Sequence, residues 1–267
     1  MKKIFISLIA IIFLVSACSK DNNPIIGDPN PINVLDTITN FSGLLIPIEN
    51  KLNVNFEHYF KANPIVYGTQ NYITDNQDTI QINNLSYRVS NMQLYNSLTA
   101  KWVDIGTYKL NSGEDAFKYR FSINKVPAGL YSKIRFNLGV DSARNRSGEQ
   151  TGDLDPALGM YWNWTNGYIH FRLEGRMPSL QTFSLDVGGS TNVVNKEIDL
   201  SNYKIKSATN GVSFNYKMDI NSFFSSPNIY NLQVDPKDIH SENSPAIKTK
   251  LLPNMLNMIL LTNVIVN

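Results

Sequence analysis

Apolar and polar residues alternate in many short stretches of this chain. In KIRFNLGV (residues 133–140), Ile134, Phe136 and Leu138 fall on one face, and VSFNYKMDI (residues 212–220) repeats the pattern. A period of two predicts β-strands with one buried face. The same alternation occurs in TIQINNLSYRV, FKYRFSI and TFSLDV, at residues 79–89, 117–123 and 182–187.

Turn-forming residues separate these strands, among them Pro127-Ala128-Gly129 and Gly188-Gly189. Helical spacing of apolar residues is found only in SPAIKTKLLPNMLNMIL (residues 244–260), where Pro253 interrupts it. We therefore predict an all-β fold, an antiparallel two-sheet β-sandwich with a short helical segment near the C-terminus.

The N-terminus has the pattern of an export signal. Lys2 and Lys3 precede an apolar run that ends in Leu14-Val15-Ser16-Ala17-Cys18. This ending resembles a bacterial lipobox, in which the cysteine is acylated and becomes the first residue of the mature protein. We predict a lipoprotein signal peptide at residues 1–17 and lipidation of Cys18; a spare cysteine near a flexible end is the alternative.

The mature chain is close to electrically neutral. Removing Lys2 and Lys3 reduces the 24 basic residues to 22, equal to the 22 acidic ones. Without a basic cluster we expect no nucleic-acid partner, and membrane contact through the Cys18 lipid alone. Residues 18–42 are rich in Asn, Asp and Pro and predict a flexible tether, so residues 43–267 remain for a single β-sandwich domain.

The sequence contains none of the common catalytic or metal-binding motifs. His58, His170 and His240 are far apart, and no HExxH, CxxC, GxSxG or phosphate-binding glycine loop occurs. Cys18 is the only cysteine, so an intramolecular disulfide is excluded. We predict that the protein is not an enzyme.

One aromatic-rich stretch, GMYWNWTNGYIHFRLEG (residues 159–175), could form either a packed corner of the fold or part of a binding site. Strand alternation places His170 on the face opposite the main core, where a solvent-facing or rim histidine is expected. Trp162 and Trp164 flank Asn163 and share a face if the segment is extended. Packing at a sandwich corner is the commoner role of such residues, and a partly enclosed aromatic wall is the alternative.

The preceding loop, residues 141–155, carries several oxygen donors that suit a hard cation. Calcium is therefore a candidate ligand there, although the spacing is not that of an EF-hand and two arginines could neutralise the carboxylates instead. A loop held by Asx turns and salt bridges is the alternative. The donors are Asp141, Asn145, Glu149, Asp153 and Asp155.

The central part of the chain resembles the MbnP-like family of exported bacterial proteins. The stretch GVDSARNRSGEQTGDLDPALGMYWNWTNGY (residues 139–168) matches the family's Gly-Val-Asp loop, its Asp-Leu-Asp-Pro turn, and its Gly-Met-Tyr-Trp-x-Trp motif followed by a Gly-Tyr strand. LSYRVSNMQL (residues 85–94) and TYKL (residues 107–110) resemble further family segments. The resemblance covers most of residues 50–265 and implies a β-sandwich.

For its characterised relatives, the resemblance implies copper binding outside the cytoplasm. There a partner dihaem oxidase converts a tryptophan to kynurenine, and the product joins histidines around the metal. Carried over, this implies His58, His240 and Asp186 as ligands and Trp162 or Trp164 as the oxidisable residue. In TFSLDVGG, however, Asp186 stands where the family has a histidine, and a carboxylate is less copper-selective than an imidazole.

Two functions remain open. The first is a lipid-anchored copper-binding protein of the bacterial envelope, at the outer membrane, on its periplasmic or surface face. The second is a non-metal binding or structural module that has lost the family's metal site.

Overall fold

The structure is a computed structural model of the 267-residue chain, and it describes residues 42–46, 49–106, 108–111, 118–163, 165–203 and 211–266. The predicted signal peptide, nearly all of the tether, Cys18 and Trp164 lie outside these residues. No helix in the described part of the chain is both long and apolar enough to cross a membrane.

Most of the described chain forms two sheets, as predicted, and the larger one has 11 strands. Its main path runs in the order β1 (Leu44–Ile46), β9 (Gly129–Leu138), β5 (Thr79–Asn96), β11 (Gly167–Arg176), β12 (Thr182–Gly188) and β15 (Asp238–Ile239). Beside this path lie β4 (Tyr72–Ile73), β6 (Lys101–Asp104), β7 (Lys109–Asn111), β10 (Tyr161–Asn163) and β13 (Val194–Asp199).

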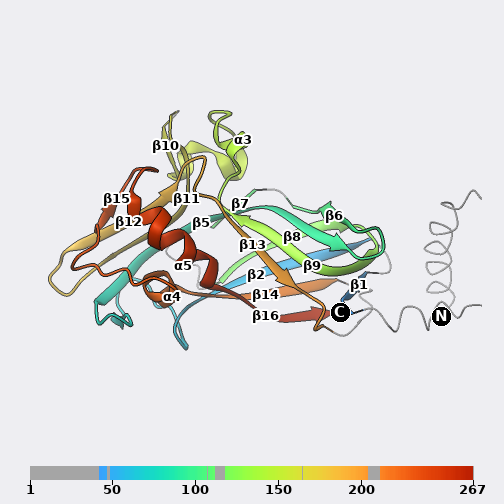
Figure 1. Cartoon of the computed structure of the whole chain (residues 1–267), viewed down its shortest axis with the longest axis horizontal. Coiled ribbons are helices and arrows are strands. Elements are labelled where there is room, and N and C mark those ends of the chain that lie inside the picture. The colour runs from blue at the N-terminus through green and yellow to red at the C-terminus, as the bar shows by residue number, and fades with distance from the viewer. Residues whose placement is uncertain are drawn as a thin grey trace, which may run out of the picture.

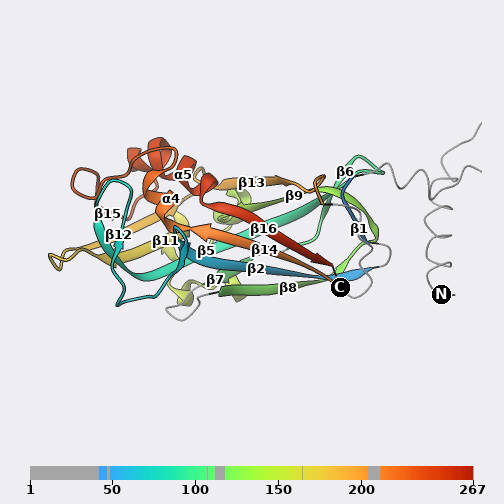
Figure 2. The same ribbon diagram turned by 90° about the horizontal axis from the view of Figure 1, so that it is seen from below.

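The smaller sheet has five strands among the described residues. They are β16 (Ile259–Val266), β14 (Val212–Asp219), β2 (Asn50–Phe60), β3 (Asn63–Pro64) and β8 (Lys118–Val126). Figure 2 shows β16, β14, β2 and β8 side by side in one layer.

Aromatic side chains from both sheets form the centre of the core. The ring of Phe56 in β2 lies 4.8 Å from that of Tyr216 in β14, 6.0 Å from Tyr87 in β5 and 5.9 Å from Phe136 in β9. The alternation predicted for β9 and β14 is confirmed, since the inward-facing residues of both strands are fully buried. Burial of apolar surface between the two sheets therefore stabilises the sandwich.

Two strand pairs are parallel, which the purely antiparallel prediction did not include. β14 runs parallel to β2, and β15 runs parallel to β12. Parallel neighbours require a long crossover connection, and each of these pairs is joined through many residues of intervening chain. Alternation along one strand does not reveal which strand becomes its neighbour.

Short helices follow the strands near the C-terminal end. Strand β14 ends at Asp219, whose side chain accepts a hydrogen bond from the Asn221 N–H and caps α4 (Ile220–Ser225). The predicted C-terminal helix consists of a π-helical turn, η3 (Ile247–Leu251), and α5 (Leu252–Asn257). Pro253 lies in the first turn of α5, where its missing N–H is tolerated, so it marks the start of α5 rather than a break.

A long connection between β9 and β11 covers part of the outer face of the larger sheet, over β5 and β11. We call residues 139–163 the cover segment; it contains α3 (Ser142–Asn145), η1 (Gly152–Leu154), η2 (Pro156–Leu158) and β10. In Figure 1, α3 and β10 project together from one side of the molecule. Side chains beneath the cover segment are thereby shielded from water although they point away from the main core.

Candidate functional site

Strand register brings five residues together, among them Asp238, which pairs with Ser184 and lies beside His240. Arg172 of β11 lies directly opposite Asp186 of β12, and Ile239 of β15 pairs with Leu185, which places His240 beside Asp186. Strand β10, at the end of the cover segment, adds Trp162. We call Trp162, Arg172, Asp186, Asp238 and His240 the Asp186 cluster.

Asp186 is fully buried at the centre of this cluster, and both of its carboxylate oxygens accept hydrogen bonds. The guanidinium of Arg172 donates from Nε to Oδ1 at 2.8 Å and from Nη2 to Oδ2 at 2.7 Å. Trp162 Nε1 also donates to Oδ2, at 3.3 Å. The charge on the carboxylate is thus met by a bidentate ion pair, the strongest kind of side-chain hydrogen bonding.

Arg172 is held on its other side as well. Its Nη1 donates to the Gly159 carbonyl at 3.0 Å, and its Nε lies 3.8 Å from Glu174 Oε1. The hydrogen bond to Asp186 is the main reason that the pKa of Arg172 is raised above its usual value. The guanidinium therefore ties β11 and β12 to the cover segment.

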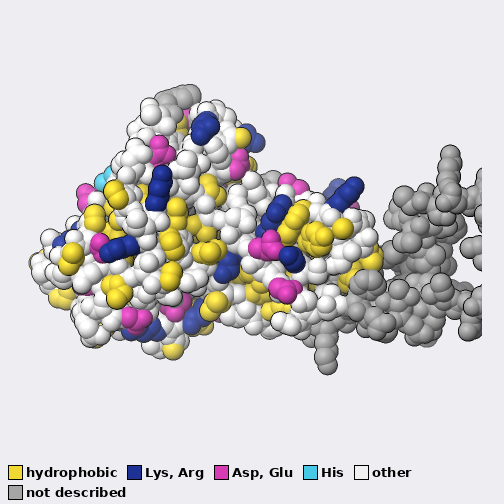
Figure 3. Space-filling model, viewed as in Figure 1, with side chains coloured by type: hydrophobic (Ala, Val, Ile, Leu, Met, Phe, Trp, Pro, Cys, Tyr) yellow, Lys and Arg dark blue, Asp and Glu magenta, His cyan; other side chains and the backbone are white. Residues whose placement is uncertain are grey.

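His240 is the exposed member of the predicted ligand set, with 52% of its side chain accessible. Its Nδ1 lies 3.1 Å from Asp186 Oδ2, and its Nε2 lies 2.7 Å from Asp238 Oδ1. Histidine surface is visible in Figure 3 near the edge formed by β12 and β15. Both ring nitrogens therefore face carboxylates.

His58 is in a different place. It lies fully buried in β2, with Nε2 2.7 Å from the Tyr87 hydroxyl and Nδ1 3.0 Å from the Tyr67 hydroxyl. Leu185 and Val187 point into the main core, so the intervening Asp186 points to the opposite face of the larger sheet. The sheet thus separates His58 from Asp186 and His240.

His170 points away from the main core as expected, but it is not at a solvent-facing rim. It is fully buried beneath the cover segment, where Nδ1 accepts from the Val140 N–H at 3.1 Å and Nε2 donates to the Gly189 carbonyl at 2.7 Å. Gly139 allows this close approach, because a Cβ there would lie 2.7 Å from the imidazole Cγ. Burial lowers the pKa of His170 to about 4.

Trp162 is a packing residue as well as a hydrogen-bond donor. It is partly buried against Leu110, Met160 and Ile169, a small apolar cluster separate from the main core. Gly188 leaves room for the indole, since a Cβ there would lie 2.9 Å from Trp162 Cζ3. This placement agrees with the packing role expected for a tryptophan in this segment.

The oxygen donors of residues 141–155 point to separate local partners. Asp141 accepts from the Tyr108 hydroxyl and from the Arg144 N–H, where it caps α3. Asp153 pairs with Lys109 at 3.1 Å, and Asp155 caps η2. Calcium binding in this loop stays a prediction. Among the residues that the structure describes, no group of three or more His, Cys, Asp or Glu side chains is arranged to hold a metal ion.

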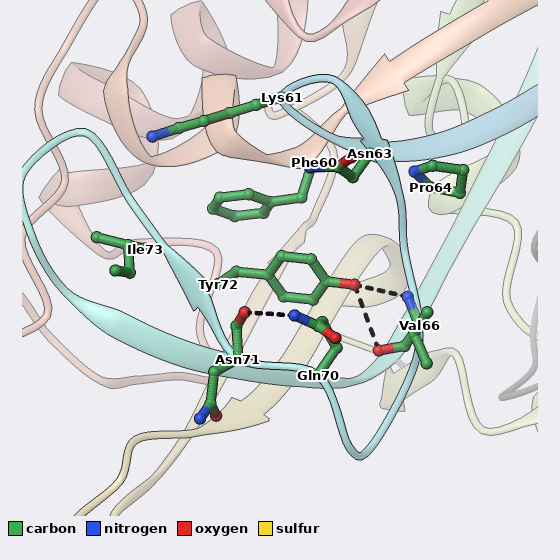
Figure 4. A pocket seen from close by; sticks show the side chains of 9 residues that line it. All are labelled: Phe60, Lys61, Asn63, Pro64, Val66, Gln70, Asn71, Tyr72 and Ile73. Carbon is green, nitrogen blue, oxygen red and sulfur yellow. Dashed lines mark hydrogen bonds between the residues drawn. The ribbon is translucent and has the colours of Figure 1, made fainter.

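A hollow of about 600 Å³ lies at the end of β2 and is lined by none of the predicted site residues. In Figure 4 the ring of Tyr72 lies beside that of Phe60, and the Tyr72 hydroxyl points to the backbone of Val66. That hydroxyl accepts from the Val66 N–H at 2.6 Å. Lys61 is the charged side chain in its lining.

Sequence reasoning missed Arg172 and Asp238 as members of the cluster. Strand alternation places Arg172 on the same face as His170, two residues before it, but its position opposite Asp186 depends on the register of β11 and β12. A buried aspartate requires a cation or several donors nearby, but the burial of Asp186 is itself a result of the fold.

Comparison with known proteins agrees with the fold and the motifs. The MbnP family model matches residues 49–243. Among solved structures, MbnP from Methylosinus trichosporium is similar with a TM-score of 0.53 and 14% sequence identity, over 81% of this chain and 98% of that one. No curated protein matches. The family model spans well over half of the chain, and the chain therefore belongs to the MbnP family.

Proposed function

We propose that this protein is an exported, lipid-anchored envelope protein that acts as a binding or structural module and does not hold copper through the predicted ligands. The export signal, the lipobox ending at Cys18 and the polar tether support the location. The sequence lacks catalytic motifs, which supports a role in binding rather than catalysis.

One observation carries the non-metal part of the proposal: the Asp186 carboxylate is already engaged by Arg172, Trp162 and His240. A metal ion needs lone pairs that are free to face it, and three donors surround Oδ2 alone. The carboxylate is neutralised inside the protein, as buried charges require.

The residues present do not fit a copper ion held by His58, Asp186 and His240. His58 lies across the larger sheet from the other two, and its ring nitrogens are engaged by Tyr67 and Tyr87. His240 meets carboxylates through both nitrogens. Copper prefers nitrogen ligands, and only one imidazole is present in the Asp186 cluster.

A second candidate function is the copper binding that the family resemblance implies. One observation favours it: Trp162, Asp186 and His240 meet at one place, although they come from three different strands or strand ends. In this candidate, a dihaem oxidase partner would oxidise Trp162 or Trp164, and His240 would contribute to the metal site. Trp164 lies outside the described residues.

Competitive copper titration separates the two candidates. The non-metal proposal predicts micromolar or weaker affinity, unchanged by His240→Ala because that imidazole does not hold a metal. A surface variant, Lys133→Met, serves as the control, since Lys133 pairs with Glu197 at the surface and belongs to none of the predicted sites. Tight binding that His240→Ala abolishes would instead establish the second candidate.

Mass spectrometry of the protein purified from its native host gives an independent answer. Unmodified tryptophans are expected under the non-metal proposal. A tryptophan that has lost one carbon and gained one oxygen, the change to kynurenine, would support the copper candidate.

A further inference from the structure

The Asp186 cluster contains a cation of its own. Asp186 has no exposed surface, whereas 20% of the Arg172 side chain is accessible. Moving a carboxylate out of water costs several kcal/mol unless an opposite charge and hydrogen bonds compensate. Arg172 supplies both, because its planar fork matches the two carboxylate oxygens.

The guanidinium is also fixed from the side opposite Asp186. Its third nitrogen donates to the Gly159 carbonyl of the cover segment, and Glu174 lies on the same outward face of β11. Movement of Arg172 away from Asp186 would therefore break contacts with β12 and with the cover segment together. Such a group is a fixed part of the site rather than a mobile surface side chain.

We propose that Arg172 is the resident cation of the Asp186 cluster and that it determines metal exclusion there, by occupying both oxygens of Asp186 and by repelling a second positive charge. This inference rests on the proposed non-metal function and adds the residue responsible for it. Arg172 is a positioning and specificity residue: it holds Asp186 through two hydrogen bonds, and its charge acts directly on any ion at the site.

Electrostatics supports the repulsive part of this role. An ion bound to Asp186 or to the adjacent His240 nitrogen would lie within a few ångströms of the guanidinium, since both groups are in contact with the same carboxylate. Like charges at that separation repel, most strongly on the side of the fully buried Asp186, where little solvent screens them. Replacing Asp186 alone would leave this repulsion in place.

The test uses Cu²⁺ as the probe, with a competing chelator, on the full chain. Five proteins are compared: wild type, Asp186→His, Arg172→Met, the double variant Asp186→His/Arg172→Met, and Asp186→His/Arg176→Met. Arg176 is the matched control because it lies on the same strand but bonds to Gln81. Circular dichroism and thermal unfolding confirm that each protein is folded.

Removing Arg172 in the Asp186→His background should raise copper affinity by roughly 10- to 100-fold, the range over which groups next to a metal site change affinity. The Arg176 control should give no gain, and adding His240→Ala to the double variant should abolish the gain. Arg172→Gln in the same background repeats the test if the methionine variant does not fold, since it removes the charge and keeps a hydrogen-bonding group.

Two failures are distinguishable. If the wild type already binds copper tightly, both the proposed function and the role of Arg172 are wrong. If the wild type binds weakly and the folded double variant binds no better than Asp186→His, only the role of Arg172 is wrong.

Discussion

At the residue scale, the Arg172–Asp186 pair is the strongest feature of the site. The partners face each other across β11 and β12, and the acid is completely buried. Removing one partner of such a pair leaves an uncompensated buried charge, whereas replacing both with apolar residues is often neutral. The stability of the site is therefore expected to depend on the pair and not on either residue alone.

We expect Arg172→Met to lower the free energy of unfolding by about 3 kcal/mol, because the Asp186 charge is left without its cation. The double variant Arg172→Met/Asp186→Leu should recover most of the loss. Urea unfolding measures both values. In contrast, Lys133→Met removes an exposed ion pair and should cost less than about 1 kcal/mol. A loss for Arg172→Met as small as that of the control would show that the pair is unimportant.

His170 should make stability depend on pH. Burial lowers its pKa from 6.5 to about 4, so the unfolded chain binds more protons than the folded protein between these values. The contribution of the neutral His170 to the free energy of unfolding is fully present above pH 6.5 and is lost as the pH falls towards 4. From pH 7 to pH 5 the loss should be about 2 kcal/mol.

Urea unfolding of wild type and His170→Gln at pH 7 and pH 5 measures the pH-dependent stability that arises from His170. The carboxylates titrate in both proteins, so their effect cancels in the comparison. The variant should lose less stability over the interval than the wild type. Equal losses would mean that His170 takes up a proton freely in the folded state.

At the scale of elements, the cover segment depends on another arginine, which is fully buried. Arg88 of β5 has no exposed surface, and its Nη1 donates to the carbonyls of Met160 and Ile169 at 2.6 and 2.7 Å. Its guanidinium also lies over the ring of Tyr168, 5.0 Å from the centroid. Burial lowers the pKa of Arg88 to about 10, which leaves it charged at neutral pH. Arg88 thus fixes the cover segment to the sheet, as Arg172 does through Gly159.

We expect Arg88→Met to loosen the cover segment, because the carbonyls of Met160 and Ile169 lose a charged donor and the Met160 carbonyl keeps only the Ile169 N–H. Hydrogen exchange of residues 139–163 should accelerate by about tenfold or more, which corresponds to a loss of at least 1.4 kcal/mol in local opening. The exposed Arg120 provides the control, Arg120→Met. Acceleration spread equally over β2 and β14 would indicate global destabilisation instead.

Several elements were predictable from the sequence because each depends on local pattern. The alternation in β9, β12 and β14 identified residues of those strands that face the main core, although not Asp186, which is buried on the opposite face of β12. Helix α4 was not predicted, since its first residue, Ile220, continues the apolar alternation and only the cap by Asp219 ends the strand. The burial of His170 was missed because the cover segment reaches it from distant sequence.

At the scale of the whole molecule, the lipid anchor is the main prediction that remains outside the described residues. Cys18→Ser should move the protein from the membrane fraction to the soluble extract, because no acyl chain can be attached. Fractionation with immunoblotting measures the change, and mass spectrometry of the wild-type N-terminus should show an acylated Cys18. Retention of the serine variant in the membrane fraction would exclude lipid attachment as the cause.

The candidate site could be predicted from the sequence only in part, because the sequence does not reveal which strands become neighbours. The resemblance pointed to Asp186, His240 and Trp162, and these meet; it also pointed to His58, which lies across the sheet. Which side chains share a face follows from strand alternation, but which strands are neighbours follows from the fold. Arg172 became recognisable as the partner of Asp186 only through the register of β11 with β12.

The most direct test of the central claim is a crystal structure of the wild-type protein soaked with copper, with anomalous diffraction recorded at the copper edge. We predict no anomalous peak within the Asp186 cluster and an intact Arg172–Asp186 pair. A copper peak at about 2 Å from His240 or Asp186, with the Arg172 guanidinium displaced, would contradict the account.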